Sequence, residues 1–388
     1  MTLDETLTSG RAHAPGEDGY EAQRLPWQRK FDPFPSLIVE AGGAADVVTA
    51  LRIARENDLP IAVQSTGHGV VSSSDGTLLL KTAGMNGVEI DPERGVARAG
   101  AGTPWGDVIA AAAPHGLAPL SGTSAGVGVA GYMLGGGAGL LSRTYGYAAD
   151  SLLRAQVVTA AGEVITASAD EHGDLFWALR GGGGNFGIVT ELEFRLFPAA
   201  PLYGGMAFFD AARAPETLAR YRDWALDEPD ESNAALVVMT LPPLPQVPEA
   251  LRGRRVLMLR SLYAGAAADG ERVLAPLLEA AGEPLMGAYA PLTYADTATM
   301  MGPPPPPSVG EVQIELFRDV PDDVLDVVAD PDGPPVAIEF RHWGGEMARP
   351  GDDAGPIGHR DVPFSVVVTA LAQDRAGWPA AKADADEI

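Results

Sequence analysis

The stretch "AVQSTGHG", residues 62–69, places one histidine between two glycines at the point where an apolar strand ends. The segment 44–59 before it has apolar residues at helical spacing, and "GTLLLKT" (76–82) after it reads as a strand. Gly67 and Gly69 leave bare backbone on both sides of His68. Because folds of this kind bind ligands at the carboxyl ends of strands, the sequence predicts an α/β unit with a ligand-binding loop around His68.

The composition excludes several classes of protein. A formal net charge of −25 argues against nucleic-acid binding, which needs clustered Lys and Arg. The absence of cysteine excludes disulfides, thiolate metal sites and cysteinyl cofactor bonds, and the six scattered histidines give no zinc motif, so no metal site is expected. No apolar window is long enough for a membrane span, and the polar, acidic start does not resemble a signal peptide, so a cytoplasmic protein is expected.

Glycine-rich stretches follow further strands, and two cofactor interpretations compete for them. "GVGVAG" (126–131) fits the G-x-G-x-x-G pattern, and Asp150 lies about 20 residues on, as in an NAD-binding unit. That pattern requires an apolar strand directly before it, which "HGLAPLSGTSA" does not provide. The alternatives are ordinary tight turns, or a backbone cradle for the diphosphate of another dinucleotide.

The composition changes near residue 200, where the glycine-rich loops end. We expect an irregular lead-in over 1–32, a first domain over 33–198 and a second over 199–388. In the first domain, 103–116 predicts a helix capped by Thr103, and 155–168 predicts a hairpin. In the second, strands alternate with helices, and "GPPPPP" (302–307) predicts a stiff exposed loop.

An ordered set of motifs resembles one family. The motifs are "PGEDGYEAQRLPWQRKFDPFPSLIVEAGG", "IAVQSTGHG", "AGAGTPWGDV", "GTSAGVGVAGYMLGGGAGLLSRTYGYAADSLL" and "GDLFWALRGGGGNFGIVTELEFRLFP". They resemble the FAD-linked oxidases of the vanillyl-alcohol-oxidase superfamily, in the berberine-bridge-enzyme-like branch. The resemblance covers residues 14–198 and resumes over 339–367. It implies an α+β fold, with a two-subdomain PCMH-type FAD-binding domain followed by an α/β substrate domain with an antiparallel sheet.

The resemblance also implies where FAD binds. His68 matches the histidine that is joined to the flavin 8α-methyl, with its bracketing glycines as clearance for the ring. Ser124 stands where some members carry a second, cysteinyl link, so a single tether is expected. The expected cofactor-binding residues are Gln64, Ser65, Thr66, Gly67, His68, Gly69, Thr123, Ser124, Gly126, Gly128, Gly131, Asp150, Gly187, Ile188 and Val189.

The implied function is that of an FAD-dependent oxidase. It would remove a hydride from a hydroxyl- or amine-bearing carbon of a small natural-product or sugar-like substrate, with O₂ as acceptor. The chain ends at "KADADEI" without the tail and late tyrosine typical of the family, so a truncated, non-catalytic flavin-binding protein is the alternative.

Removal of the substrate proton requires a base, for which the second domain offers several candidates. We favour His342, His359 and Tyr263 as candidate bases, and Arg341 and Arg360 are further candidates. Glu339 and Arg341 alternate along one strand face and predict a solvent-facing ion pair.

Overall fold

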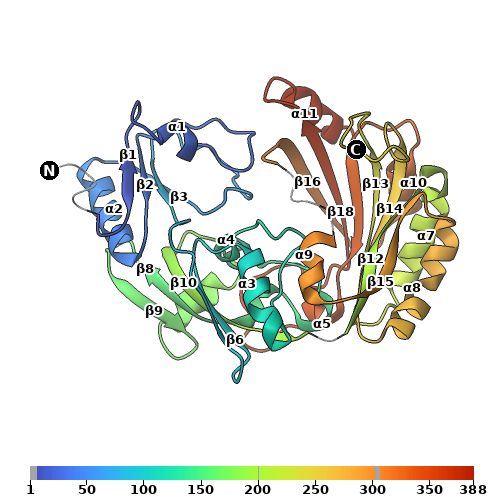
Figure 1. Ribbon diagram of the computed structural model, residues 1–388, viewed down its shortest axis with the longest axis horizontal. Helices are drawn as coiled ribbons and strands as arrows, with labels where there is room; N and C mark the ends of the chain where they lie inside the picture. The colour runs from blue at the N-terminus through green and yellow to red at the C-terminus, as the bar shows by residue number, and fades with distance from the viewer. Residues whose placement is uncertain (1–6, 200, 301, 303–305) are drawn as a thin grey trace.

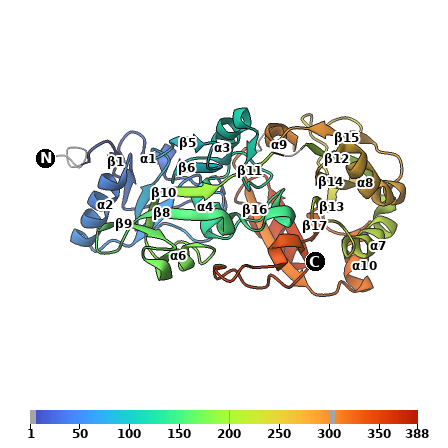
Figure 2. The ribbon, with the colours of Figure 1, turned by 90° about the horizontal axis from the view of Figure 1, so that it is seen from below.

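The computed structural model describes residues 7–199, 201–300, 302 and 306–388, and it shows two lobes side by side along the long axis (Figures 1 and 2). One lobe contains the chain up to β11 and the other is built on a sheet that begins at β12 (Leu202–Asp210). The predicted boundary at residue 198 falls between these strands and stays a prediction. The expected proline loop over 302–307 lies partly outside the described residues.

The first sheet of the N-terminal lobe has the order β1-β2-β4-β3. Its strands are β1 (Arg11–His13), β2 (Leu37–Glu40), β3 (Ile61–Gln64) and β4 (Leu78–Lys81). β2 and β3 both run parallel to β4, and β4 is buried along its whole length. The amphipathic helix α2 (Ala44–Glu56) covers the sheet with Val47, Ala50 and Ile53. The predicted order of helix, strand, loop and strand around His68 is confirmed.

The second sheet of this lobe is antiparallel, with the order β5-β6-β10-β8-β9. Its strands are β5 (Val88–Asp91), β6 (Val96–Gly100), β8 (Leu152–Val158), β9 (Val164–Ser168) and β10 (Ile188–Arg195). The predicted hairpin is β8–β9. A two-stranded ladder, β7 (Leu117–Ala118) with β11 (Phe197–Pro198), closes the lobe. Besides α2, the helices of this lobe are α1 (Tyr20–Gln23), α3 (Trp105–Ala112), α4 (Val129–Leu134), α5 (Ser142–Tyr145) and α6 (Gly173–Leu179).

The predicted start of the helix at Thr103 is wrong. Pro104 is the N-cap of α3, and the buried Thr103 donates its hydroxyl to the Gly87 carbonyl instead of capping the helix. The tertiary contact to Gly87 uses the oxygen that a cap would need. The predicted C-terminal stop is confirmed, since Gly116 adopts a left-handed conformation with φ 66° after the short 3-10 turn that follows α3.

The second lobe is one seven-stranded antiparallel sheet, with the order β15-β12-β14-β13-β17-β18-β16. The strands after β12 are β13 (Ser232–Thr240), β14 (Arg255–Ala264), β15 (Met286–Leu292), β16 (Val309–Phe317), β17 (Ala337–His342) and β18 (Phe364–Ala372). The helices are α7 (Ala214–Ala225), α8 (Ala267–Ala281), α9 (Thr297–Met300), α10 (Asp322–Ala329) and α11 (Trp378–Asp386). α7, α8 and α10 cover the outer face of the sheet (Figure 1), so its other face is turned toward the first lobe. The predicted α+β fold class is confirmed.

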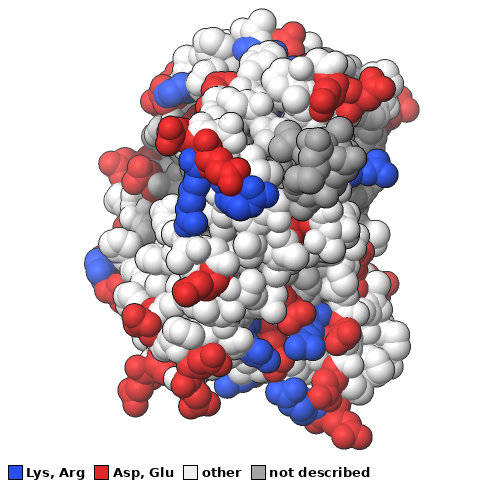
Figure 3. All heavy atoms as spheres, turned by 90° about the vertical axis from the view of Figure 1, so that its left-hand side faces the viewer, with Lys and Arg blue, Asp and Glu red and all other residues white. Residues whose placement is uncertain are grey.

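The surface reflects the acidic composition. On the face shown in Figure 3, acidic side chains are scattered widely, and the basic ones lie among them. In the part of the chain that the structure describes, no helix is long and apolar enough to cross a membrane. Over the same residues, no group of histidine and acidic side chains is arranged to hold a metal ion.

Candidate active site

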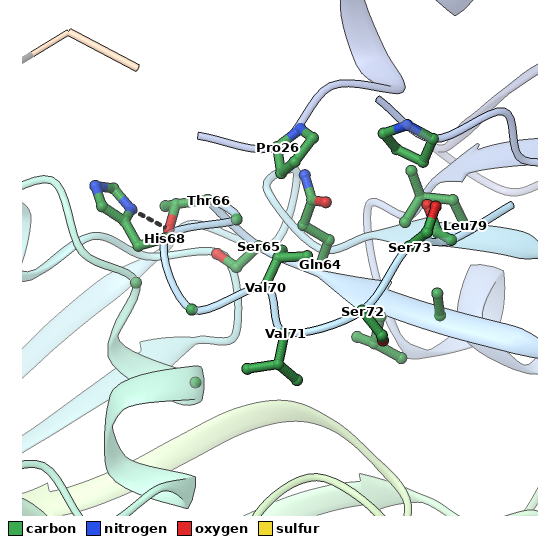
Figure 4. Close-up of a pocket in the computed structure, with 18 of the residues that line it drawn as sticks. Pro26, Gln64, Ser65, Thr66, His68, Val70, Val71, Ser72, Ser73 and Leu79 are labelled. Atoms are coloured by element: carbon green, nitrogen blue, oxygen red, sulfur yellow. Dashed lines mark hydrogen bonds between the residues drawn. The ribbon is translucent and has the colours of Figure 1, made fainter. Parts of the chain in front are cut away.

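The loop that leaves β3 lines a cavity of about 690 Å³. Residues 61–74 form most of its wall, which also includes Pro26, Val127, Gly128, Gly131 and Tyr132. Figure 4 shows Thr66 and His68 on one side of the cavity, Gln64 near the centre, and Ser73 and Leu79 on the other side. We call it the loop cavity. Its volume is within the range of ligand sites in proteins.

His68 is held in place by two contacts. Its Nδ1 lies 2.8 Å from the Thr66 hydroxyl, which Figure 4 shows as a dashed line. Its ring stacks on Trp27, with 4.4 Å between ring centroids and 16° between planes. The Trp27 amide in turn donates to the Thr66 carbonyl, so the two segments fix one another. Burial lowers the pKa of His68, which keeps the ring neutral at neutral pH, the form in which a ring nitrogen has a lone pair for bonding.

The glycines beside His68 have different roles. Gly67 has φ 78°, and a Cβ there would lie 2.8 Å from Pro26 Cα, so Gly67 is required by its own backbone and by the neighbouring segment. Gly69 is exposed, and a Cβ there would meet nothing within 4 Å. Gly67 thus has a packing role of its own, and the interpretation of both glycines as clearance for a cofactor stays a prediction.

The wall of the loop cavity carries hydrogen-bonding groups that suit a dinucleotide. Gln64 Nε2 and Ser65 Oγ are buried and have no hydrogen-bond partner among the described residues. A Cβ on Gly128 would come within 2.9 Å of Ser65 Oγ, so the bare backbone keeps this part of the wall open. No Lys or Arg is among the described residues lining the cavity, so a diphosphate there would rely on backbone N–H groups and hydroxyls. The unpartnered polar groups of Gln64 and Ser65, the bare backbone at Gly128 and the volume of the loop cavity together fit FAD.

A second, smaller cavity of about 180 Å³ lies between the lobes, and we call it the inter-lobe cavity. From the first lobe it is lined by Gly122, Thr123, Ser124, Val127, Tyr132, Ala138, Gly139 and Leu140. From the second it is lined by Asn233, Arg260 and Arg341. Val127 and Tyr132 line both cavities, so the two adjoin. The predicted residues Thr123 and Ser124 thus lie at the junction of the lobes, and a Cβ on Gly126 would lie 3.9 Å from His68 Cε1.

Five predicted cofactor residues do not line either cavity: Gly126, Asp150, Gly187, Ile188 and Val189. Ile188 and Val189 begin β10 in the second sheet, and Gly187 directly precedes that strand, where a Cβ would meet Val157 at 2.5 Å. The Asp150 carboxylate is occupied by Arg360, at 2.7 and 2.9 Å, and by the Tyr147 amide at 3.0 Å. In this structure the role of Asp150 is to cap a turn and anchor Arg360.

The predicted catalytic bases lie away from the inter-lobe cavity. Alternation along β17 turns His342 to the opposite face from Arg341, toward the buried helix-covered core. There its Nδ1 lies 2.7 Å from Glu228 Oε1 and 2.9 Å from Arg143 Nη1. Burial raises the pKa of Glu228 despite these two neighbours. We therefore assign His342 to an ionic cluster, formed by Arg143, Glu228 and His342, that joins the lobes.

The other two predicted bases also lie outside the lining of the inter-lobe cavity. His359 is an exposed loop residue with φ 55°. Tyr263 packs against the core of the second lobe, where burial raises the pKa of its hydroxyl. The geometry supports none of the three residues as the base.

The ion pair of Glu339 and Arg341 was predicted to face solvent, and this is wrong. Glu339 bonds to Arg341 and to Arg260 Nη2 at 3.3 Å, on the sheet face turned toward the first lobe. The sequence reasoning missed Arg260, Asn233 and Tyr132. One signal was available for Arg260, which is the single charge inside the largely apolar run "VLMLRSL".

Comparison with known proteins agrees with this architecture. A family model described as "FAD binding domain" matches residues 35–168. The (R)-6-hydroxynicotine oxidase of Paenarthrobacter nicotinovorans is 41% identical over 190 residues, which are 48% of this chain and 42% of that protein. The chain thus matches less than half of the length of this curated relative.

Solved structures extend the likeness to nearly the whole chain. BBE-like 1 of Physcomitrella patens has a TM-score of 0.87 at 22% identity, covering 100% of this chain and 87% of that one. The 6-hydroxy-D-nicotine oxidase of Arthrobacter nicotinovorans has a TM-score of 0.82 at 26% identity, covering 98% and 84%.

The fold, the loop cavity and these matches define the class: residues 35–168 match an FAD-binding domain, and nearly the whole chain shares the fold of 6-hydroxy-D-nicotine oxidase. The fold match to BBE-like 1 agrees with the predicted likeness to the berberine-bridge-enzyme-like branch. The NAD interpretation of "GVGVAG" is wrong. The stretch lies inside the FAD-domain match, and the structure has no strand directly before it.

Proposed function

We propose that the protein is an FAD-dependent oxidase with a flavin tethered only through His68. The observation that carries this proposal is the neutral, stacked His68 at the end of the loop cavity, next to Gly126. When bound, FAD supplies a two-electron acceptor. Ser124 at the inter-lobe cavity and the absence of cysteine leave no thiol for a second link.

Each residue of the two cavities has a definite task in this proposal. Thr66 and Trp27 fix the plane of the His68 ring, while Gln64 and Ser65 offer their unspent polar atoms to the dinucleotide. Tyr132 has a buried hydroxyl with no hydrogen-bond partner among the described residues, and burial raises its pKa far above neutrality. Tyr132 therefore acts as a hydrogen-bond donor between the cavities and not as a base.

The proposed substrate is a small molecule with a hydroxyl- or amine-bearing carbon. That carbon loses a hydride and its O–H or N–H loses a proton, and O₂ takes up the two electrons to give H₂O₂. The names of several relatives support this range, since they include a nicotine oxidase and a chitooligosaccharide oxidase. A cytoplasmic location remains part of the proposal.

Anaerobic substrate screening tests the function. The flavin absorbance is followed while alcohols, secondary amines and oligosaccharides are added, and O₂ uptake and H₂O₂ are then measured. We expect at least one compound to bleach the flavin and to consume O₂. A flavin that dithionite reduces but that no compound in these classes bleaches would support the non-catalytic alternative.

A further inference from the structure

Two arginines share one face of the second lobe's sheet at the inter-lobe cavity. Arg260 on β14 and Arg341 on β17 are both register partners of Ala235 on the intervening strand β13. Because paired residues of antiparallel strands point to the same side, both guanidinium groups are directed toward the first lobe. Asn233, two residues along β13, lies on that same face and also lines the cavity.

The charges of this cluster do not cancel. Glu339 is ion-paired with both Arg260 and Arg341. Burial would raise the pKa of Glu339, but the two guanidinium groups outweigh burial and lower it, so the carboxylate is ionised. Burial lowers the pKa of Arg260 to about 10, which leaves it protonated at neutral pH. Among the residues that the structure describes, two cations of this cluster thus face one anion, in a protein whose net charge is −25.

Two hydrogen-bonding groups at the cavity remain unused. Arg341 Nε is buried and has no partner among the described residues, and neither has Tyr132 Oη on the opposite wall. The Arg341 guanidinium stacks on Trp343, 4.8 Å from its ring centroid, which fixes its orientation. A buried cation with an unspent donor is costly unless an acceptor fills the space beside it.

We propose that the inter-lobe cavity binds the carboxylate of an anionic substrate, with Arg341 as its charged anchor and Tyr132 and Asn233 as neutral partners. This inference rests on the proposed function, because it names the substrate class of the same site. A carboxylate supplies the negative charge and the planar acceptor pair that a guanidinium group recognises.

The sheet surface beyond Arg341 is apolar. On β18, Ser365 pairs with Arg341 on one side and with Leu316 of β16 on the other. Val367 in the same way pairs with Glu339 and with Ile314 of β16. Ile314 and Leu316 are 60% and 45% exposed on this face. An acid with an apolar body would therefore place its carboxylate at the arginines and its body along these side chains.

The test compares benzoate with its neutral isostere benzamide by calorimetric titration of the flavin-loaded protein. We expect benzoate to bind and benzamide to bind at least about 10-fold more weakly. Arg341→Gln should weaken benzoate by about 10- to 100-fold and bring it to the level of benzamide. Arg318→Gln is the matched control, since it removes an exposed arginine of the same lobe and should leave benzoate affinity unchanged.

Three results would overturn the proposal. The first is benzoate binding no tighter than benzamide to a wild-type protein with a normal flavin spectrum. The second is an Arg341→Gln variant that shifts the flavin midpoint potential but keeps benzoate affinity, because the arginines would then serve the flavin. The third is a Tyr132→Phe variant with full affinity, which is decisive if Arg341→Gln does not fold. The absorption spectrum tests the proposed function separately, because a preparation without flavin would refute that function. Calorimetry would still test whether the inter-lobe cavity binds an anion.

Discussion

Trp27 and His68 lie face to face, with 4.4 Å between their ring centroids, although they are 41 positions apart in the sequence. Trp27 comes from the segment before β2, and His68 from the loop after β3. The stacking therefore ties the lead-in segment to the loop cavity and sets the plane of the ring that we propose to hold the flavin.

Replacement of Trp27 tests whether that contact positions His68. Aromatic pairs contribute about 0.5–1.5 kcal/mol, so Trp27→Ala should slow covalent flavin attachment by about 2- to 10-fold. Trp27→Phe should retain most of the rate. The rate is measured as the fraction of flavin that co-precipitates with acid-denatured protein over time. The exposed Trp177→Ala serves as the control, and an unchanged rate in Trp27→Ala would show that the stacking is incidental.

The two glycines beside His68 give a matched pair of variants. Gly67→Ala combines a left-handed φ with overlap on Pro26, so it should destabilise the protein by about 1–3 kcal/mol or more even without flavin. Gly69→Ala should change stability by less than about 0.5 kcal/mol, because nothing lies within 4 Å of its Cβ.

Denaturant unfolding in a His68→Ala background, from which the flavin can be removed, measures both effects. If Gly69 is clearance for the cofactor, Gly69→Ala should still lower flavin affinity. Equal stability losses in the two variants would contradict the assignment of Gly67 to the packing of Pro26.

Asp46 gives a prediction about pH and stability. Burial would raise the pKa of its carboxyl, but hydrogen bonds from the Thr8 and Gly42 amides and from Ser9 outweigh burial and lower it. Because the folded-state pKa is lowered, the carboxylate stabilises the protein above its ordinary pKa of about 4, and this contribution is lost as the pH falls through the lower folded value.

Asp46→Asn should therefore cost about 1–3 kcal/mol at pH ~7, since an amide cannot accept from all these donors. The difference from the wild type should shrink steadily below about pH 4. Urea unfolding of both proteins across this range checks the prediction. A difference that is constant with pH would mean that the charge of Asp46 does not contribute.

His342 should prove structural. His342→Leu removes a buried partner of Glu228, so it should lower the free energy of unfolding by about 1–3 kcal/mol while the pH dependence of flavin reduction keeps its shape. His359→Ala, at an exposed position, should leave both unchanged. Loss of an inflection from the pH–rate profile of His342→Leu, with normal stability, would instead identify His342 as the base.

Local patterns predicted the elements around the site, but not which faces meet. The helix, strand and loop before His68 and the β8–β9 hairpin follow from periodicity and turn residues close in the sequence. Alternation along β17 also showed that Glu339 and Arg341 share a face. It could not show that residues 122–140 cover that face, because this contact joins segments about 200 positions apart. Contacts between distant segments likewise bury His342 on the opposite face of the sheet, against Glu228 and Arg143.

The most direct test of the central claim is the intact mass of the acid-denatured protein, measured for the wild type and for His68→Ala. The account predicts that the wild-type polypeptide carries the mass of one FAD, and that the variant has the mass of the polypeptide alone and releases its flavin into the supernatant. Free flavin from the wild type, or flavin still attached in His68→Ala, would contradict it.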